Sequence, residues 1–248
     1  MKKVLVELES QVFVFDLTSP IDISIPLQAG KNNPNCYFAT PPLFSTIKAE
    51  NFVGSVKEGG SCNYQELRLT PHGNGTHTEC YGHISDDGAS INQSLNNFFA
   101  VALLVSVAPR KVGEDFIVFW EDLNITEENY EALIIRTLPN LEEKLVKDYN
   151  NSNPPYLSED VGRNLAKQGV KHLLVDLPSV DKEVDGGVLA CHKAFWQYPQ
   201  NTRKDATISE LIYVPSAIQD GIYLLNLQII SLETDASPSK PILYKKSV

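Results

Sequence analysis

The sequence predicts a mixed α/β or α+β fold in which strands outnumber helices. Segments of strand length, rich in β-branched and aromatic residues, recur along the chain, whereas helix-capping signals occur at only a few places. The 248 residues are 42% hydrophobic and 21% charged, which is typical of a globular protein with a buried core. The chain has no internal repeat and no low-complexity tract, so a repeat architecture is not expected.

Seven segments are predicted as strands because β-branched and aromatic residues dominate them, in several cases with alternating polarity. In chain order they are Val4–Leu8, Val12–Leu17, Phe98–Ala108, Phe116–Trp120, Ala132–Thr137, Val170–Asp176 and Gly221–Leu232. A loop rich in proline and asparagine follows the second strand and runs from Pro20 to Pro42. Loops of this length are uncommon and often functional.

The predicted helices are few and short. Asn140 is placed to cap a helix over Leu141–Tyr149, with Glu143 at the capping-box position. Ser158 is placed to cap a second helix that ends before Gly169. Thr126 is a candidate start for a short third helix. Asp148–Pro155 resembles a linker, but the strand patterns on its two sides are alike, so we expect one domain over residues 1–248.

The charge and the hydropathy of the chain exclude several classes of function. A net charge of −10 with scattered basic residues disfavours binding to nucleic acid or to an anionic membrane surface. No apolar run reaches the roughly 18–20 residues of a membrane helix. Glu7 and Glu9 interrupt the start of the chain, so we expect no secretion signal and a cytoplasmic location. The four cysteines, without a C-x-x-C spacing, are then expected to be reduced thiols.

Three of the five histidines lie in one twelve-residue window, His72 to His83. His77 and Glu79 are two residues apart, so in an extended strand their side chains point to the same side and together suit a divalent metal. Three glycines interrupt the window and allow tight turns that bring the other histidines to the same point. The alternative is a polar loop, but this clustering favours a metal or catalytic site.

A second group of polar residues follows a predicted strand downstream. It begins with Asp176–Asp181 and continues to His192 and Glu210, which are both typical metal ligands. Taken alone, His192 is more typical of a helix surface and Glu210 of a solvated charge. His172 lies within a predicted strand, and we interpret it as structural.

Together these residues resemble the cyclase family of metal-dependent hydrolases, which includes bacterial kynurenine formamidase. The family motif is His-x-Gly-Thr-His-x-Asp-x-Pro-x-His. This chain carries Gly75-Thr76-His77, then Glu79 in the aspartate place, then His83 at the last position. The resemblance extends over nearly the whole chain, and its other matching segments are Phe15–Ile21, Ala132–Thr137, Asp176–Asp181, His192 and Glu210.

The resemblance implies a swivelling β/β/α fold, a homodimer or larger homo-oligomer, and a small-molecule substrate. It implies one or two divalent ions, zinc or manganese, bound by His77, Glu79, His192 and Glu210, with His83 as the general acid/base. The implied reaction is hydrolysis of an amide, a formamide or a cyclic C–N bond by metal-activated water.

The chain departs from the family pattern at a few defined positions. The family's first histidine falls at Gly73, and His72 lies one residue early. Either a bulge brings His72 to the metal, or Asn74 or water takes that place. Glu79 is one methylene longer than the family's aspartate. The loop segment Leu27–Lys31 lacks the aromatic residue that the family often has there, which argues against kynurenine formamidase itself.

These departures leave alternatives to a metal-dependent hydrolase. One is a degenerate member of the same fold that binds a metal or a small molecule without catalysis. Another makes Cys80 a nucleophile beside His77 or His83, although burial of a small thiol is the more common role for a cysteine. Tyr81, Phe195 and Trp196 are candidates either for an aromatic substrate pocket or for the core.

Overall fold

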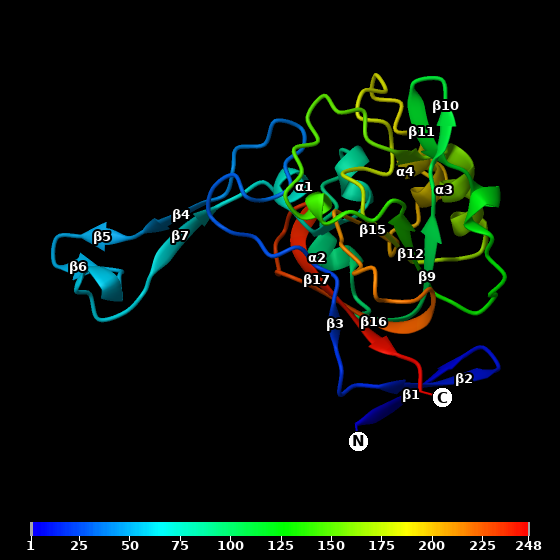
Figure 1. Ribbon diagram of the computed structural model, residues 1–248, viewed down its shortest axis with the longest axis horizontal. Helices are drawn as coiled ribbons and strands as arrows, with labels where there is room; N and C mark the ends of the chain where they lie inside the picture. The colour runs from blue at the N-terminus through cyan, green and yellow to red at the C-terminus, as the bar shows by residue number, and fades with distance from the viewer. Residues whose placement is uncertain (1, 248) are drawn as a thin grey trace.

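The computed structural model describes residues 2–247 and confirms the mixed α/β fold with few helices (Figure 1). Its centre is an eight-stranded sheet in the order β16-β9-β12-β14-β15-β8-β17-β3. Because β16 also pairs with β17, all of these strands except β3 form a closed, barrel-like ring. The strands of this sheet are β3 (Ile21–Asp22), β8 (His77–Glu79), β9 (Phe99–Val107), β12 (Ala132–Thr137), β14 (His172–Val175), β15 (Thr207–Glu210), β16 (Gly221–Ile229) and β17 (Ala236–Lys245).

Both faces of the central strands are buried. Strands β9, β12, β14 and β15 are parallel neighbours, and their residues alternate between two apolar clusters. On β12, Ala132 and Ile134 point into the ring, whereas Leu133 and Ile135 point outward. The outer cluster is covered by α3 (Glu159–Lys167) and α4 (Ala190–Trp196), with Phe195 and Trp196 fully buried in it. Such two-sided burial is expected for parallel strands and explains their nearly continuous apolar sequences.

The strand predictions are largely confirmed, and the structure adds strands that the sequence patterns did not indicate. Six predicted segments match a strand closely, whereas Phe116–Trp120 is shifted because the strand covers Asp115–Val118. The central strands β8, β15 and β17 were not predicted. The first two are short and polar, and β17 contains two prolines, so none has the usual strand pattern.

Of the three predicted helices, only the one after Ser158 is confirmed. It is α3, and Gly169 follows it with a left-handed φ of +75°. The helix over Leu141–Tyr149 was wrong, because only a 3₁₀ turn forms there and the Asn140 side chain donates to the Val214 carbonyl instead of capping. The helix at Thr126 was also wrong, since the segment after residue 123 is irregular.

The remaining elements are small. The helices α1 (Pro71–Asn74) and α2 (Ile91–Ser94) are single turns, and 3₁₀ turns cover Val56–Glu58, Tyr81–Ile84, Trp120–Leu123 and Glu142–Leu145. The minor sheets contain β1 (Lys3–Leu8) with β2 (Gln11–Asp16), β4 (Leu43–Thr46) with β7 (Gln65–Arg68), β5 (Lys48–Ala49) with β6 (Phe52–Val53), and β10 (Arg110–Val112) with β11 (Asp115–Val118) and β13 (Tyr156–Leu157). Strands β4 to β7 form an arm that extends away from the body (Figure 1). Within residues 2–247, every helix is too short or too polar to cross a bilayer.

Candidate metal centre

The centre begins on β8, whose outward face carries His77 and Glu79. The strand lies between β15 and β17, and its register pairs His77 with Glu210 on β15. The Nε2 atom of His77 is 3.3 Å from Oε2 of Glu210, and all three side chains are buried. Glu210 is therefore brought to the centre by strand pairing, whereas its sequence alone was more typical of a solvated charge.

His192 reaches Glu79 from the covering helix α4. Its Nε2 lies 3.0 Å from Oε1 of Glu79 and 3.8 Å from Oε1 of Glu210. Its Nδ1 lies 2.6 Å from Oδ2 of Asp181, which also accepts the backbone N–H of His192. The Asp181 carboxylate thus fixes the ring so that Nε2 faces the two glutamates.

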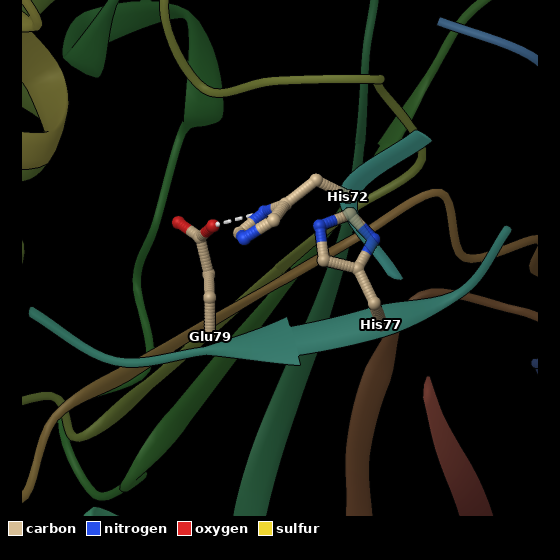
Figure 2. Close-up of side chains that lie close together, drawn as sticks. All are labelled: His72, His77 and Glu79. Carbon is tan, nitrogen blue, oxygen red and sulfur yellow. Dashed lines mark ion pairs between the residues drawn. The ribbon is translucent and has the colours of Figure 1, made fainter. Parts of the chain in front are cut away.

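His72 also reaches the centre, although it lies one residue before the position of the family's first histidine. It lies in α1 with Nδ1 3.1 Å from Oε2 of Glu79, and Figure 2 shows its ring between Glu79 and His77. No side chain fits at Gly73, where a Cβ would be 2.3 Å from that of Ala39. Asn74 does not take the place, because its side chain bonds to the backbone of Thr70 and Thr40.

His83 lies at the mouth of the centre, in the 3₁₀ turn after β8. Its Nδ1 is 3.9 Å from Oε2 of Glu79 and 3.3 Å from Oδ2 of Asp235, and 32% of its side chain is exposed. The structure therefore gathers all six predicted residues, because His72, His77 and His192 contact Glu79 or Glu210 and His83 lies nearest to solvent.

Unpartnered buried atoms test whether these residues suit a cation. Nε2 of His77 and Oε2 of Glu79 are buried, and neither makes a well-aligned hydrogen bond within residues 2–247, although they lie 3.3 Å from Oε2 of Glu210 and 3.1 Å from Nδ1 of His72, respectively. Nδ1 of His77 is 2.9 Å from the Gly75 carbonyl, so in the neutral ring Nδ1 carries the proton and Nε2 is an acceptor. Two buried acceptors without a donor are costly, and a divalent ion would satisfy both. The donor set of imidazoles and carboxylates therefore fits such an ion.

His72 and His192 are the side chains of the centre that favour the protonated form when no metal is bound. Burial opposes the charged form of His192, but the Asp181 and Glu79 carboxylates outweigh it and raise the pKa of His192 to about 10. Burial likewise opposes charge on His72, and Asp235 with Glu79 raises its pKa to about 10. Burial alone would raise the pKa of Glu79, but the imidazoles of His83, His192 and His72 hold it well below its usual range. Metal binding would displace such protons.

A cavity of about 350 Å³ opens onto the centre and contains His72, His83, His192 and Glu210 in its wall. Tyr37, from the long N-terminal loop, and Leu189 also line it. The three aromatic residues considered for the pocket are not in its lining, since Tyr81, Phe195 and Trp196 are buried in the outer apolar cluster.

Cys80 lacks the properties of a nucleophile. Its side chain is fully buried, and its thiol points to the carbonyl of Ala89 at 3.8 Å. Burial raises the pKa of Cys80, so the reactive thiolate is disfavoured.

Three residues of the site were missing from the sequence-based assignment. Asp181 was part of a noticed acidic segment, but nothing local linked it to His192. Tyr37 belongs to the loop whose length suggested a function. Asp235 lies between β16 and β17 and gave no signal, because only the fold brings it to His72 and His83.

Comparison with known proteins finds relatives whose sequences align with nearly the full length of this chain. The kynurenine formamidase of Bacillus cytotoxicus is 28% identical over 226 residues, which cover 90% of this chain and 96% of the relative. The kynurenine formamidase of Bacillus mycoides is 26% identical over the same shares.

Solved structures share the fold. One described as a potential metal-dependent hydrolase with cyclase activity has a TM-score of 0.65 at 17% identity, covering 93% of this chain and 99% of that one. An isatin hydrolase bound to the product analogue thioisatinate has a TM-score of 0.64 at 13% identity, covering 92% of each chain. The family model described as putative cyclase matches residues 15–182. The chain therefore belongs to the putative cyclase family.

Proposed function

We propose that this protein is a metal-dependent hydrolase that cleaves an amide, a formamide or a cyclic C–N bond. The observation that carries the proposal is the pair of buried, unpartnered acceptors, Nε2 of His77 and Oε2 of Glu79, beside the accessible imidazole of His83. The names of its relatives support the reaction class, since they are kynurenine formamidases and, among structures, isatin hydrolases.

In this proposal five side chains hold one or two divalent ions, zinc or manganese. They are His72, His77, Glu79, His192 and Glu210. A divalent ion held here would act as a Lewis acid toward the substrate carbonyl and toward water. Glu79 touches both His72 and His192 through its two oxygens, which makes it the residue best placed to be shared between two ions.

His83 is the proposed general acid/base. It lies at the mouth of the cavity, where substrate and water enter. Its imidazole accepts a proton as water oxygen bonds to the carbonyl carbon, and returns it to the nitrogen as the C–N bond breaks. A leaving amine or amide nitrogen is thereby released in its neutral form.

We further propose a homodimer or larger homo-oligomer, in a single domain and in the cytoplasm. The four cysteines are free thiols, which agrees with a reducing compartment. The extended arm, defined here as residues 43–69, exposes Leu43, Tyr64 and Leu67 and offers a surface for self-association.

The proposal is tested by metal analysis together with hydrolysis of an aryl formamide and of isatin. We expect zinc or manganese in the purified protein and loss of turnover after chelation, restored by the metal. Glu79→Ala should lose both metal and activity. His83→Ala should keep its metal and lose activity by roughly 10²–10⁴-fold, because only the proton transfer is removed.

Cys80→Ala serves as the control and should retain activity, since the thiol is buried and points away from the centre. Full activity in both Glu79→Ala and His83→Ala would contradict the mechanism. A protein that binds metal but hydrolyses no amide, formamide or lactam would instead favour the degenerate, non-catalytic binding protein.

A further inference from the structure

Asp235 contacts both His72, which lies one residue before the motif position, and His83. Its Oδ2 lies 2.8 Å from Nε2 of His72 and 3.3 Å from Nδ1 of His83. Within residues 2–247 its carboxylate makes hydrogen bonds to these two imidazoles and to no other group. We propose that Asp235 is a positioning residue that sets the tautomer and the ring orientation of both His72 and His83, an inference that rests on the function proposed for this centre.

The backbone around Asp235 is held firmly against the centre. Its carbonyl accepts the N–H of Cys80 at 3.0 Å, directly after β8. The next residue, Ala236, is paired with Glu79 in the ladder between β17 and β8. The carbonyl of Thr234 accepts the N–H of Ile91 at 2.8 Å, at the start of α2. The carboxylate therefore starts from a fixed point beside the strand that carries Glu79.

For His72, the contact decides which nitrogen faces the metal ligands. An ionised carboxylate only accepts, so Nε2 of His72 carries the proton that points to Asp235. In the neutral ring Nδ1 is then an acceptor, and it lies 3.1 Å from Oε2 of Glu79. A metal-binding imidazole usually donates its second N–H to such an acceptor.

The same arrangement occurs at the other two inner histidines. His77 donates through Nδ1 to the Gly75 carbonyl, and His192 donates through Nδ1 to Asp181. Asp235 supplies the equivalent acceptor for His72. His72 presents Nδ1 to the centre, whereas His77 and His192 present Nε2.

For His83, the same oxygen selects the nitrogen that exchanges protons. With Nδ1–H donated to Asp235, the acceptor of the neutral ring is Nε2. The side chain is 32% exposed, and its ring packs against the rings of His72 and His192, with centroids 4.4 and 5.6 Å away, which restrict its position but do not select a tautomer. Without Asp235, both tautomers of His83 would be populated, and the productive fraction would fall.

Asp235→Asn tests this inference in the zinc-loaded full-length protein. The amide keeps the shape of the side chain but can donate to Nδ1 of His83 and so favour the opposite tautomer. We expect ¹⁵N spectra of labelled histidine, recorded near pH 8, to show His83 protonated at Nδ1 in the parent and shifted toward Nε2–H in the variant. A His83→Gln sample assigns the resonance.

Two further measurements separate positioning from coordination. The variant should lose kcat by roughly 10–100-fold with little change in KM, and zinc competition with a chelator should show weaker affinity at unchanged stoichiometry. Asp235→Glu should recover part of kcat. Glu233→Gln is the matched control, because Glu233 lies in the same loop but bonds to Ser90, Asn92 and Gln93 of the α2 turn.

An unchanged His83 tautomer in Asp235→Asn would overturn the inference, as would loss of one zinc equivalent, which would make Asp235 a ligand. Equal effects of Glu233→Gln and Asp235→Asn would also overturn it, by showing a general effect of the loop. The spectra and the zinc titration need no substrate. If the parent protein hydrolyses nothing, the proposed function fails while the role of Asp235 is still decided.

Discussion

His172 is the histidine that lies apart from the centre, and its environment keeps it neutral. It occupies the first position of β14, is buried, and has Nδ1 2.9 Å from the hydroxyl of Thr207. Burial, assisted by the charge of Lys171, lowers the pKa of His172 to about 4. In the unfolded chain the ring titrates near its usual value of about 6.5. Below that pH the unfolded state binds a proton that the folded state does not.

The pH dependence of stability should therefore contain a contribution from His172. It is absent above about pH 6.5, and it destabilises the fold increasingly as the pH falls toward 4. Between pH 7.5 and 5 the loss is about 2 kcal/mol. Urea unfolding of the parent and of His172→Gln should show a smaller loss in the variant, because other titrating groups are common to both. Equal losses of unfolding free energy in the parent and in His172→Gln would contradict this role of His172.

At the scale of elements, the segment after β14 is the part of the fold that aligns the centre. Residues 176–181 carry Asp181, and the N–H of Val180 donates to Oε1 of Glu210 at 2.9 Å. At its start, buried Asp176 accepts the N–H and the hydroxyl of Thr137 and lies 2.8 Å from Nζ of Lys144. A buried ion pair outside the centre therefore anchors the segment that orients His192.

Removal of the cation from that pair should destabilise the fold. Lys144→Met leaves the Asp176 carboxylate buried without its partner, and we expect a loss of roughly 3–5 kcal/mol in the free energy of unfolding. Lys147→Met is the matched control on the same segment, because Lys147 pairs with Glu143 at the surface and should cost less than about 0.5 kcal/mol. Denaturant unfolding measures both. Similar losses would show that the buried pair contributes no more than a surface pair.

In the molecule as a whole, the arm is the feature that projects away from the body (Figure 1). Its paired strands form two-stranded sheets, and every residue of β7 is exposed (Figure 1). Two-stranded ribbons are marginally stable in isolation, and Leu43, Tyr64 and Leu67 are each more than half exposed. Contact with a second copy of the chain would bury this apolar surface, which is why the arm supports the proposed oligomer.

Charge placed on the arm should weaken self-association. We expect light scattering after gel filtration to give an oligomeric mass for the parent and a lower mass for Leu67→Glu combined with Leu43→Glu. Leu5→Glu is the control, because Leu5 is 68% exposed but lies on the N-terminal hairpin. A monomeric parent would contradict the proposed oligomer, and an unchanged mass in the arm variant would exclude the arm as its interface.

Local sequence patterns were sufficient to locate the main strands and the core of the centre. Strand patterns placed β9, β12, β14 and β16 correctly, because propensity and alternation depend only on neighbouring residues. The clustering of His72, His77, Glu79 and His83 identified the centre for the same reason. The helix expected after Asn140 failed because the tertiary contact with Val214 outweighed the capping signal.

The distant residues that complete the centre are brought there by long-range packing. Glu210 faces His77 because β15 pairs with β8, and Asp235 contacts His83 across a separation of 152 residues. The same packing places His72 beside Glu79, whereas a side chain at position 73 would have no room against Ala39. Such contacts depend on closure of the sheet into a ring and on packing of its covering segments, and no local sequence pattern encodes them.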